Sequence, residues 1–282
     1  MSAAPTVRLA ALRSEIPKLW AFMRRDFKIA WSYKLPFFTD WVGMLVQVFM
    51  FQFVGMIVDP SLVPSYEGNQ ATYMEFVAVG IAISTFTGIA LGRVYAVVRQ
   101  EQVQGTLESL MLTPTASTTI ELGSVVYDLV YVPVRMTIFF LLTTVLVGTD
   151  FYWSGLLVTI PLLLAYIPFV WGLGIMAAAW TITYKRGTGV IGLVTTALTL
   201  TSGAYFPIDV LPAWLQKLAA LNPMAIALDG ARDALLGGAT FAQIATDVLA
   251  LLPFAVVSMV LGTRSFQAAL SRERRRGTLG LY

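Results

Sequence analysis

Neither cysteine nor histidine occurs among the 282 residues of this chain. Thiolate nucleophiles, disulfides and cysteine metal sites are therefore excluded, and the commonest general base and metal ligand is missing as well. Any chemistry would have to rest on carboxylates, lysine, tyrosine or serine. We therefore expect no catalytic residue, no metal site and no cofactor bound by this chain, and an intramembrane enzyme is disfavoured.

Two charged residues, Asp128 and Arg135, lie inside an otherwise apolar segment. Their separation of seven residues is about two helical turns, which places both on one face of a helix. A charge at membrane depth costs at least about 2.5–3.5 kcal/mol on insertion scales and is a functional candidate by default. Two interpretations stay open. The residues form a pair that fixes helix packing, with Tyr127 or Tyr131, or they line an inner vestibule and contact an amphiphilic substrate.

A polar stretch from Glu101 to Pro114 separates two apolar segments and is the second candidate site. Leu107, Leu110 and Met111 share one face of a short predicted helix over residues 104–113, which Pro114 ends. A brief amphipathic helix with an apolar face between charged residues has the form of a docking element for a soluble partner.

The composition predicts the environment of these candidates. Hydrophobic residues make up 57% of the chain, charged residues only 12%, and the mean hydropathy is +0.74. A soluble globular chain carries about 25% charged residues. The chain is therefore predicted to be an all-α integral membrane protein, with membrane lipids around it and no nucleic-acid partner, although its pI is near 9.2.

Charge-free windows of about 20 residues, the length of a helix that crosses a bilayer, predict six transmembrane helices within a membrane domain over residues 35–265. The predicted spans are 35–58, 74–98, 123–147, 154–181, 187–205 and 243–263. This topology places sixteen of the nineteen Lys and Arg residues on one side, Lys217 and Arg232 on the other, and Arg135 inside the third span. Because basic loops stay cytoplasmic, both termini are expected in the cytoplasm.

The ends of the chain lie outside the predicted spans. Within residues 1–34, Ile16, Leu19, Met23 and Phe27 recur at three- and four-residue steps among basic residues, which is the pattern of an interfacial amphipathic helix. This helix is either a simple anchor or also a contact for a cytoplasmic partner. Residues 266–282 form a basic cytoplasmic tail.

The segment between the fifth and sixth spans predicts short broken helices over residues 209–237. Asp209 is expected to cap one, while Asn222 and Pro223 read as the N-cap and first residue of another, and Gly237 begins its stop. The segment is too apolar for a solvated loop, and we expect it to re-enter the outer leaflet under cover of protein. An ordinary loop with surface helices is the alternative.

Together these residues resemble the ABC-2 type permeases, the membrane subunits of drug, antibiotic, polysaccharide and glycolipid exporters. The first similar motif comprises Glu101, Gly105, Thr106, Leu107, Glu108, Leu110, Met111, Thr113 and Pro114. The second comprises Phe206, Pro207, Pro212, Trp214, Asn222, Pro223 and Arg232. The resemblance covers nearly the whole chain.

The resemblance implies a specific mechanism. The first motif would be a coupling helix that seats in a separate ATP-binding subunit, and the second an extracytoplasmic gate segment. This chain contains no GxxxxGK[ST] phosphate loop, so ATP and Mg would be bound by that partner. Two ATP-binding subunits and a second permease copy or paralogue would complete an exporter in the bacterial cytoplasmic membrane, moving an amphiphilic drug or lipid-like substrate.

A secondary transporter or channel not driven by ATP is the alternative function. Such proteins carry inverted repeats or carboxylates at mid-membrane depth. The sequence has no clear repeat, and the predicted spans other than the third carry no acidic residue at mid-depth.

Overall fold

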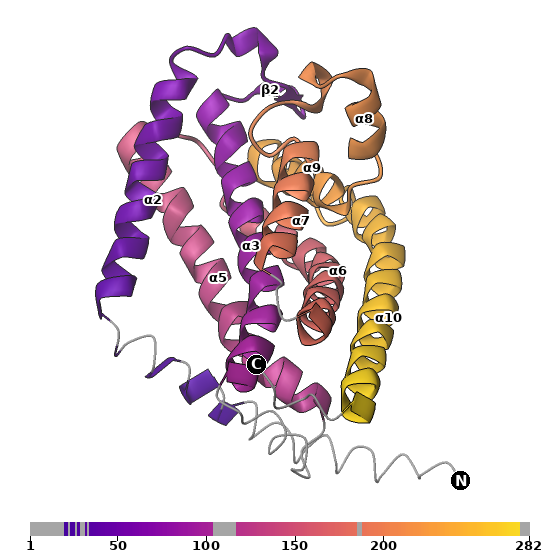
Figure 1. Ribbon diagram of the computed structural model, residues 1–282. Coiled ribbons are helices and arrows are strands. Elements are labelled where there is room, and N and C mark those ends of the chain that lie inside the picture. The colour runs from indigo at the N-terminus through magenta and orange to yellow at the C-terminus, as the bar shows by residue number, and fades with distance from the viewer. Residues whose placement is uncertain are drawn as a thin grey trace.

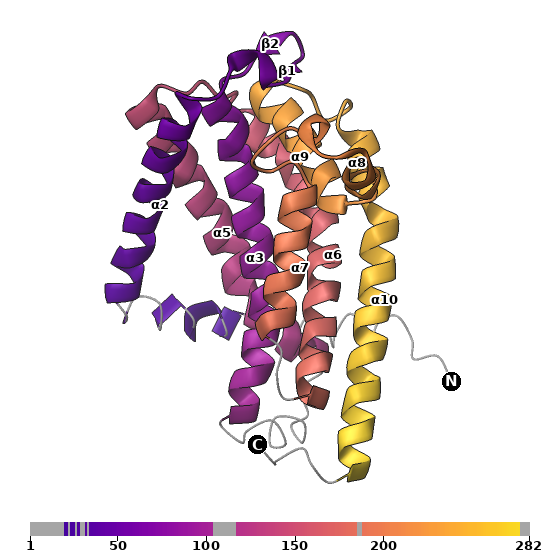
Figure 2. The same cartoon turned by 45° about the horizontal axis from the view of Figure 1, so that its top comes forward.

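The computed structural model describes residues 20–276, except for residues 22, 26, 29–31, 33, 104–116 and 185–187 (Figure 1). The helices are α2 (Lys34–Gly55), α3 (Tyr73–Val103), α5 (Ser117–Val147), α6 (Gly155–Tyr184), α7 (Thr188–Thr201), α8 (Ala213–Ala219), α9 (Pro223–Leu236) and α10 (Ala245–Arg276). Two 3-10 turns, η1 (Pro60–Leu62) and η2 (Ile208–Val210), and a hairpin of β1 (Ser65–Tyr66) and β2 (Asn69–Gln70) complete the described elements. The hairpin and α8 lie at one end of the helix bundle, here called the hairpin end (Figures 1 and 2).

All six segments predicted as spans are helical at their centres, and four helices are long and apolar enough to cross a membrane. These four stretches are Tyr73–Arg93, Val130–Val147, Gly155–Tyr184 and Ala245–Glu273. The apolar part of α7 is shorter (Gly189–Thr201). The mostly helical architecture of the prediction is confirmed at this level.

Several helix ends differ from the prediction. Helix α10 continues to Arg276 and α3 to Val103, because a backbone helix does not need apolar side chains to extend beyond an apolar stretch. Helix α7 instead ends at Thr201, short of the predicted residue 205. The cause is Gly203, whose positive φ of 76° terminates the helix.

Parts of three predictions lie outside the described residues: the coupling helix over 104–113, most of the interfacial helix, and the end of the basic tail. Within the interfacial helix, the residues that the structure describes are helical. The described beginning of the tail belongs to α10.

Helices α6 and α10 pack with their backbones close together. A Cβ added to Gly172 would lie 2.7 Å from the Met259 nitrogen, and one added to Gly262 would lie 2.6 Å from the Gly172 oxygen. Ser258 adds a hydrogen bond from its Oγ to the Pro168 oxygen at 3.4 Å. Small residues at a crossing point are the usual way for helices to associate in lipid, where apolar side chains alone provide no driving force.

Helix α3 lies at the centre of the bundle, in contact with α2, α5, α6, α7 and α9 (Figure 2). Its apolar stretch is the most buried of the four candidate spans. A buried hydrogen bond joins the Thr87 and Tyr166 hydroxyls of α3 and α6 at 2.9 Å, and it satisfies both polar groups inside the apolar core.

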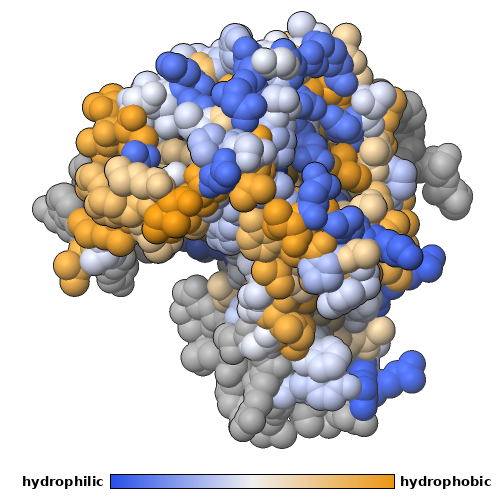
Figure 3. All heavy atoms as spheres, turned by 90° about the horizontal axis from the view of Figure 1, so that it is seen from above, coloured by the Kyte–Doolittle hydropathy of each residue, from blue (hydrophilic) through white to orange (hydrophobic). Residues whose placement is uncertain are grey.

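The start of α3 is held by a reciprocal cap. The Glu75 carboxylate accepts hydrogen bonds from the Thr72 and Asp150 backbone nitrogens, both at 2.8 Å, while Thr72 Oγ1 accepts one from the Glu75 nitrogen at 3.3 Å. This is a capping box that also ties α3 to the α5–α6 connection. Seen from the hairpin end, hydrophilic residues gather from the upper centre to the right of the view, and hydrophobic residues lie at the left and through the middle (Figure 3).

Candidate functional site

The second sequence motif folds at the hairpin end around α9. Asn222 is the N-cap of this helix, since its side chain accepts a hydrogen bond from the Met224 nitrogen at 2.9 Å, and Pro223 is the first helical residue. The predicted start and the stop at Gly237 are therefore confirmed. Asn222 Nδ2 also donates to the Leu198 oxygen at 2.8 Å and to Thr201 Oγ1 at 2.9 Å, which joins α9 to the end of α7.

Helix α9 is a buried helix, unlike the surface helix of the alternative interpretation. Most of its residues are buried, and it packs against α3, α6 and α10. Gly155 allows part of this packing, because a Cβ there would meet the backbone of Ala234 and Leu235. The part of the predicted re-entrant segment that forms α9 is therefore covered by protein. Helix α8 differs, with Trp214 and Leu218 exposed.

Arg232 is the most buried charged residue of the described chain, with 2% of its surface exposed. Its Nη2 donates to the backbone oxygens of Gly203 at 2.8 Å and of Phe76 and Ala204 at 3.3 Å. The guanidinium carbon lies 3.6 Å from the centre of the Phe76 ring, a cation–π contact. These partners compensate the burial of a charge that would otherwise be prohibitive.

The sequence counted Arg232 among the charges outside the predicted spans, and the structure adds that protein encloses this residue. Charge counting treats a basic residue between two apolar segments as solvated, whereas the tertiary fold encloses it. Gly203 is essential to the arrangement, because its positive φ turns the chain so that successive carbonyls face the arginine. Gly80 of α3 lies directly against the Ala204 carbonyl.

Asp229 and Tyr66 lie close enough to Arg232 to interact with its charge. Burial raises the pKa of Asp229 to about 6, with Arg232 opposing the shift and Asp233 and Asp247 adding to it. Burial also raises the pKa of Asp233, and Asp247 and Glu67 raise it further. The hairpin contributes as well, since burial raises the pKa of Tyr66 to about 12 against the opposing charge of Arg232. Arg232 therefore interacts with the hairpin, α3, the α7–α8 connection and its own helix.

The rest of the second motif shapes the α7–α8 connection. Pro207 is the N-cap of η2 and Pro212 the N-cap of α8, each without a side-chain cap. The expectation that Asp209 caps α8 is wrong, because Asp209 lies within η2. Gln216 closes this turn by donating from Nε2 to the Leu211 oxygen at 2.9 Å and to the Asp209 oxygen at 3.2 Å. Phe206 is half-buried beside it.

Arg135, one of the two charged residues of the third predicted span, has a partner on another helix. Arg135 Nη2 of α5 lies 2.8 Å from Asp40 Oδ1 of α2, and Tyr131 OH donates to Asp40 Oδ2 at 3.3 Å. The predicted pairing of Arg135 with Asp128 falls on a side chain outside the described residues. Asp128 lies in α5, in a part whose side chains are outside the described residues. Asp40 was visible in the sequence only as the charge near the start of the first predicted span.

The first motif is positioned by two helices that extend beyond their apolar stretches. Glu101 belongs to the last turn of α3 and α5 begins at Ser117, while Gly105 through Pro114 lie outside the described residues. Both helix ends lie at the end of the bundle opposite the hairpin (Figure 1). In the part of the chain that the structure describes, no group of three or more Asp and Glu side chains could hold a metal ion.

Comparison with known proteins gives one family and a few relatives. The family model described as "ABC-2 type transporter" matches residues 17–236. Nodulation protein J of Rhizobium leguminosarum bv. viciae is 28% identical over 71% of this chain and 77% of its own length. Nodulation protein J of Neorhizobium galegae is 26% identical over 82% and 86%. The Linearmycin resistance permease protein LnrN of Bacillus subtilis is 25% identical over 72% of this chain and 52% of its own length.

Proposed function

This chain belongs to the ABC-2 type transporter family, and from that membership we propose that it is the permease subunit of an ATP-driven exporter. The observation that carries the proposal is the extent of the family match, which covers residues 17–236 and so includes both sequence motifs. Family membership implies a transport subunit in the membrane and an ATP-binding partner subunit.

The proposed topology has six membrane-spanning helices, α2, α3, α5, α6, α7 and α10, with both termini in the cytoplasm of a bacterium. The hairpin, α8 and α9 would then be extracytoplasmic. Arg264, Arg272 and Arg275 of α10 support this orientation, because they lie toward the end opposite the hairpin and basic residues favour the cytoplasmic side.

The proposed coupling element, through which the ATP-binding subunit acts on the permease, is the segment from Glu101 to Pro114. It connects α3, the central helix of the bundle, with α5. A displacement of this segment by an ATP-binding subunit would act on both helices at once. Leu107, Leu110 and Met111 would insert into the partner, and Glu101 and Glu108 would make polar contacts at its edge.

The complete exporter would contain two such permeases, identical or paralogous, and two ATP-binding subunits that hold ATP and Mg. The proposed substrate is an amphiphilic drug or lipid-like molecule. One relative supports the drug class by its name, which is that of a linearmycin resistance permease.

Affinity purification of the full-length chain from its native membrane in mild detergent tests this function. We expect a subunit with a GxxxxGK[ST] phosphate loop to co-purify, and the transport activity of the reconstituted complex to be sensitive to vanadate. A Leu107→Asp, Leu110→Asp double variant should lose the partner. Ser109→Asp, on the opposite face of the predicted helix, is the matched control and should retain it. Vanadate-insensitive transport by a chain that purifies without an ATPase would contradict the proposal.

A further inference from the structure

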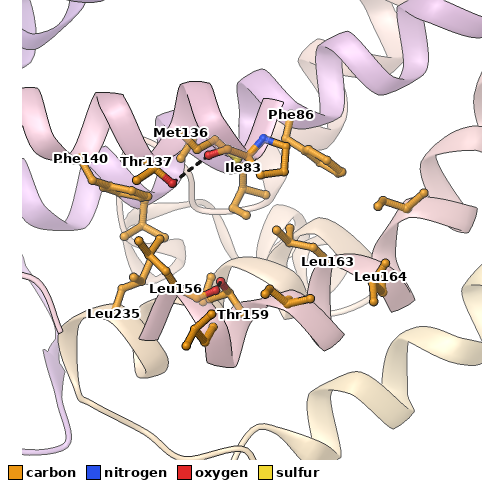
Figure 4. Close-up of a pocket in the computed structure, with 17 residues that line it drawn as sticks. Ile83, Phe86, Met136, Thr137, Phe140, Leu156, Thr159, Leu163, Leu164 and Leu235 are labelled. Atoms are coloured by element: carbon orange, nitrogen blue, oxygen red, sulfur yellow. Dashed lines mark hydrogen bonds between the residues drawn. The ribbon is translucent and has the colours of Figure 1, made fainter. Parts of the chain in front are cut away.

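A cavity of about 480 Å³ lies between α3, α5, α6 and α9. In Figure 4, the labelled side chains of α3 and α5 form one wall and those of α6 the facing wall, with Leu235 of α9 at one end. Its volume is within the range of sites that hold small molecules, about 300–1,000 Å³. Its lining residues include neither Arg232 nor Asp40 and Arg135.

The lining is matched to an uncharged, apolar occupant. None of the residues that line it is charged, and only Thr137 and Thr159 carry hydroxyl groups. Thr137 Oγ1 donates to the Pro133 oxygen at 2.9 Å and Thr159 Oγ1 to the Leu156 oxygen at 2.8 Å. Since both hydroxyls already donate within their own helices, the cavity offers little to water, which needs two to four polar partners in a buried site.

The cavity opens within the apolar stretches of the helices. Leu157, Ile160 and Leu164 recur on one face of α6 and are 63%, 47% and 61% exposed, yet all three line the cavity. They form a rim at the surface of a helix that is apolar enough to cross a membrane. Thr137 lies ten residues before the hairpin-end terminus of α5, which corresponds to a depth of about 15 Å at 1.5 Å per residue.

An occupant of matching shape and polarity would restore packing contacts to the walls of this cavity. Protein interiors are packed as densely as organic crystals, and walls without partner atoms lose their dispersion contacts. The medium at the rim of a membrane helix consists of acyl chains, so an acyl chain is the occupant that both the position and the polarity of the cavity select.

We propose that this cavity binds one acyl chain of a membrane phospholipid, which enters between α5 and α6 past the Leu157–Leu164 rim. The bound chain fills the bundle beneath α9 and contacts Leu235 and Ala231 of that helix. The proposal rests on the chain lying in a bilayer and is independent of ATP coupling.

The test uses the full-length chain in phosphatidylcholine nanodiscs that contain phosphatidylcholine spin-labelled in the middle of one acyl chain. Electron spin resonance should detect an immobilised component for the unaltered protein. Thr137→Trp fills the cavity and should reduce the number of immobilised lipids per protein by about one. Val134→Trp is the matched control, because Val134 is on the same helix, is 52% exposed and does not line the cavity; it should leave the component unchanged.

A second measurement does not require the bulky substitution. The chain has no cysteine, so Thr137→Cys provides a unique attachment point for a small fluorophore. We expect the spin-labelled acyl chain to quench this fluorophore more than tenfold better than a water-soluble nitroxide at equal concentration.

Four outcomes overturn the proposal. An equal immobilised component in all variants, or an equal loss in Thr137→Trp and Val134→Trp, would mean that the signal comes from lipid elsewhere on the surface. Efficient quenching by the water-soluble nitroxide would mean that the cavity is hydrated. Displacement of the lipid signal by a second copy of the chain or by a transported substrate would assign the cavity to that occupant instead.

Discussion

Arg135 of α5 and Asp40 of α2 form an ion pair at 2.8 Å, although 95 residues separate them in the sequence. Tyr131, one turn before Arg135, donates to the same carboxylate. The pair joins the first described long helix to the helix that follows the proposed coupling segment. Its side chains are 18% and 34% exposed, so solvent screens it only in part.

Removal of one partner of this pair should destabilise the protein. Arg135→Ala leaves the Asp40 carboxylate without its cation, and we expect a loss of about 1–3 kcal/mol in the free energy of unfolding, measured as a lower thermal midpoint in detergent. Tyr131→Phe should cost less, about 0.5–1.5 kcal/mol. The charge-swapped Asp40→Arg, Arg135→Asp variant should recover part of the loss. An Arg135→Ala protein of unchanged stability would show that the pair does not hold α2 against α5. Unchanged export by this variant would exclude contact between Arg135 and the substrate.

Arg232 should be the least replaceable cation of the described chain. Arg232→Met leaves three backbone carbonyls without their donor, and the loss of one partner in a buried charged network costs about 3–5 kcal/mol. We expect little folded protein by size-exclusion chromatography in detergent. Lys217→Met is the control, since Lys217 is an exposed cation in the last turn of nearby α8. Equal amounts of folded protein for the two variants would contradict the stabilising role assigned to Arg232.

Gly80 should not tolerate even a methyl group. A Cβ at this position would collide with the Ala204 backbone, and overpacking of this kind costs about 1–3 kcal/mol. Gly92 lies on the same helix with nothing within 4 Å of an added Cβ. Gly92→Ala should therefore be neutral or stabilising by up to about 1 kcal/mol, because alanine favours the helix. Thermal midpoints of the two variants measure the difference. Equal midpoints would indicate that the connection after α7 can move away from α3.

The stability of the hairpin end should depend on pH through Asp229. Its folded pKa of about 6 lies above 3.8, the ordinary pKa of an aspartate, so the folded state binds the proton more tightly. The stabilising contribution of this proton is therefore fully present below pH 3.8 and is lost as the pH rises through about 6. Solvent reduces its size, because the Asp229 side chain is exposed. The charged groups that face Asp229 are Arg232 and Asp233 of α9 and Asp247 of α10.

Asp229→Asn should remove most of this dependence and raise the thermal midpoint above pH 7. Asp209→Asn changes an exposed carboxylate of η2 and should leave the profile of the unaltered protein in place. A pH profile that Asp229→Asn does not change would assign the dependence to another group, such as Asp233.

Local features of the fold were predictable from the sequence. The apolar stretches identify the long helices because hydrophobicity of about 20 successive residues is read without knowledge of any neighbour. The start of α9 was predictable for the same reason. The Asn222 side chain caps a backbone nitrogen two residues away, and this interaction needs only the local chain. Asp209 shows the limit, because Pro212 is the N-cap of α8 and the capping position is set by the turn that Gln216 closes.

The sequence by itself determined the membrane class of this protein, the approximate helices and the two motifs that identify its family. Only the tertiary structure decided which charges meet: Asp40 with Arg135, and Arg232 with the carbonyls of Phe76, Gly203 and Ala204. Charge counting placed Arg232 outside the spans, since nothing local shows that a charged residue between two apolar segments is buried. The difference has a physical reason: helix formation and capping act over a few residues, whereas ion pairing, burial and the apolar cavity depend on which distant helices pack together.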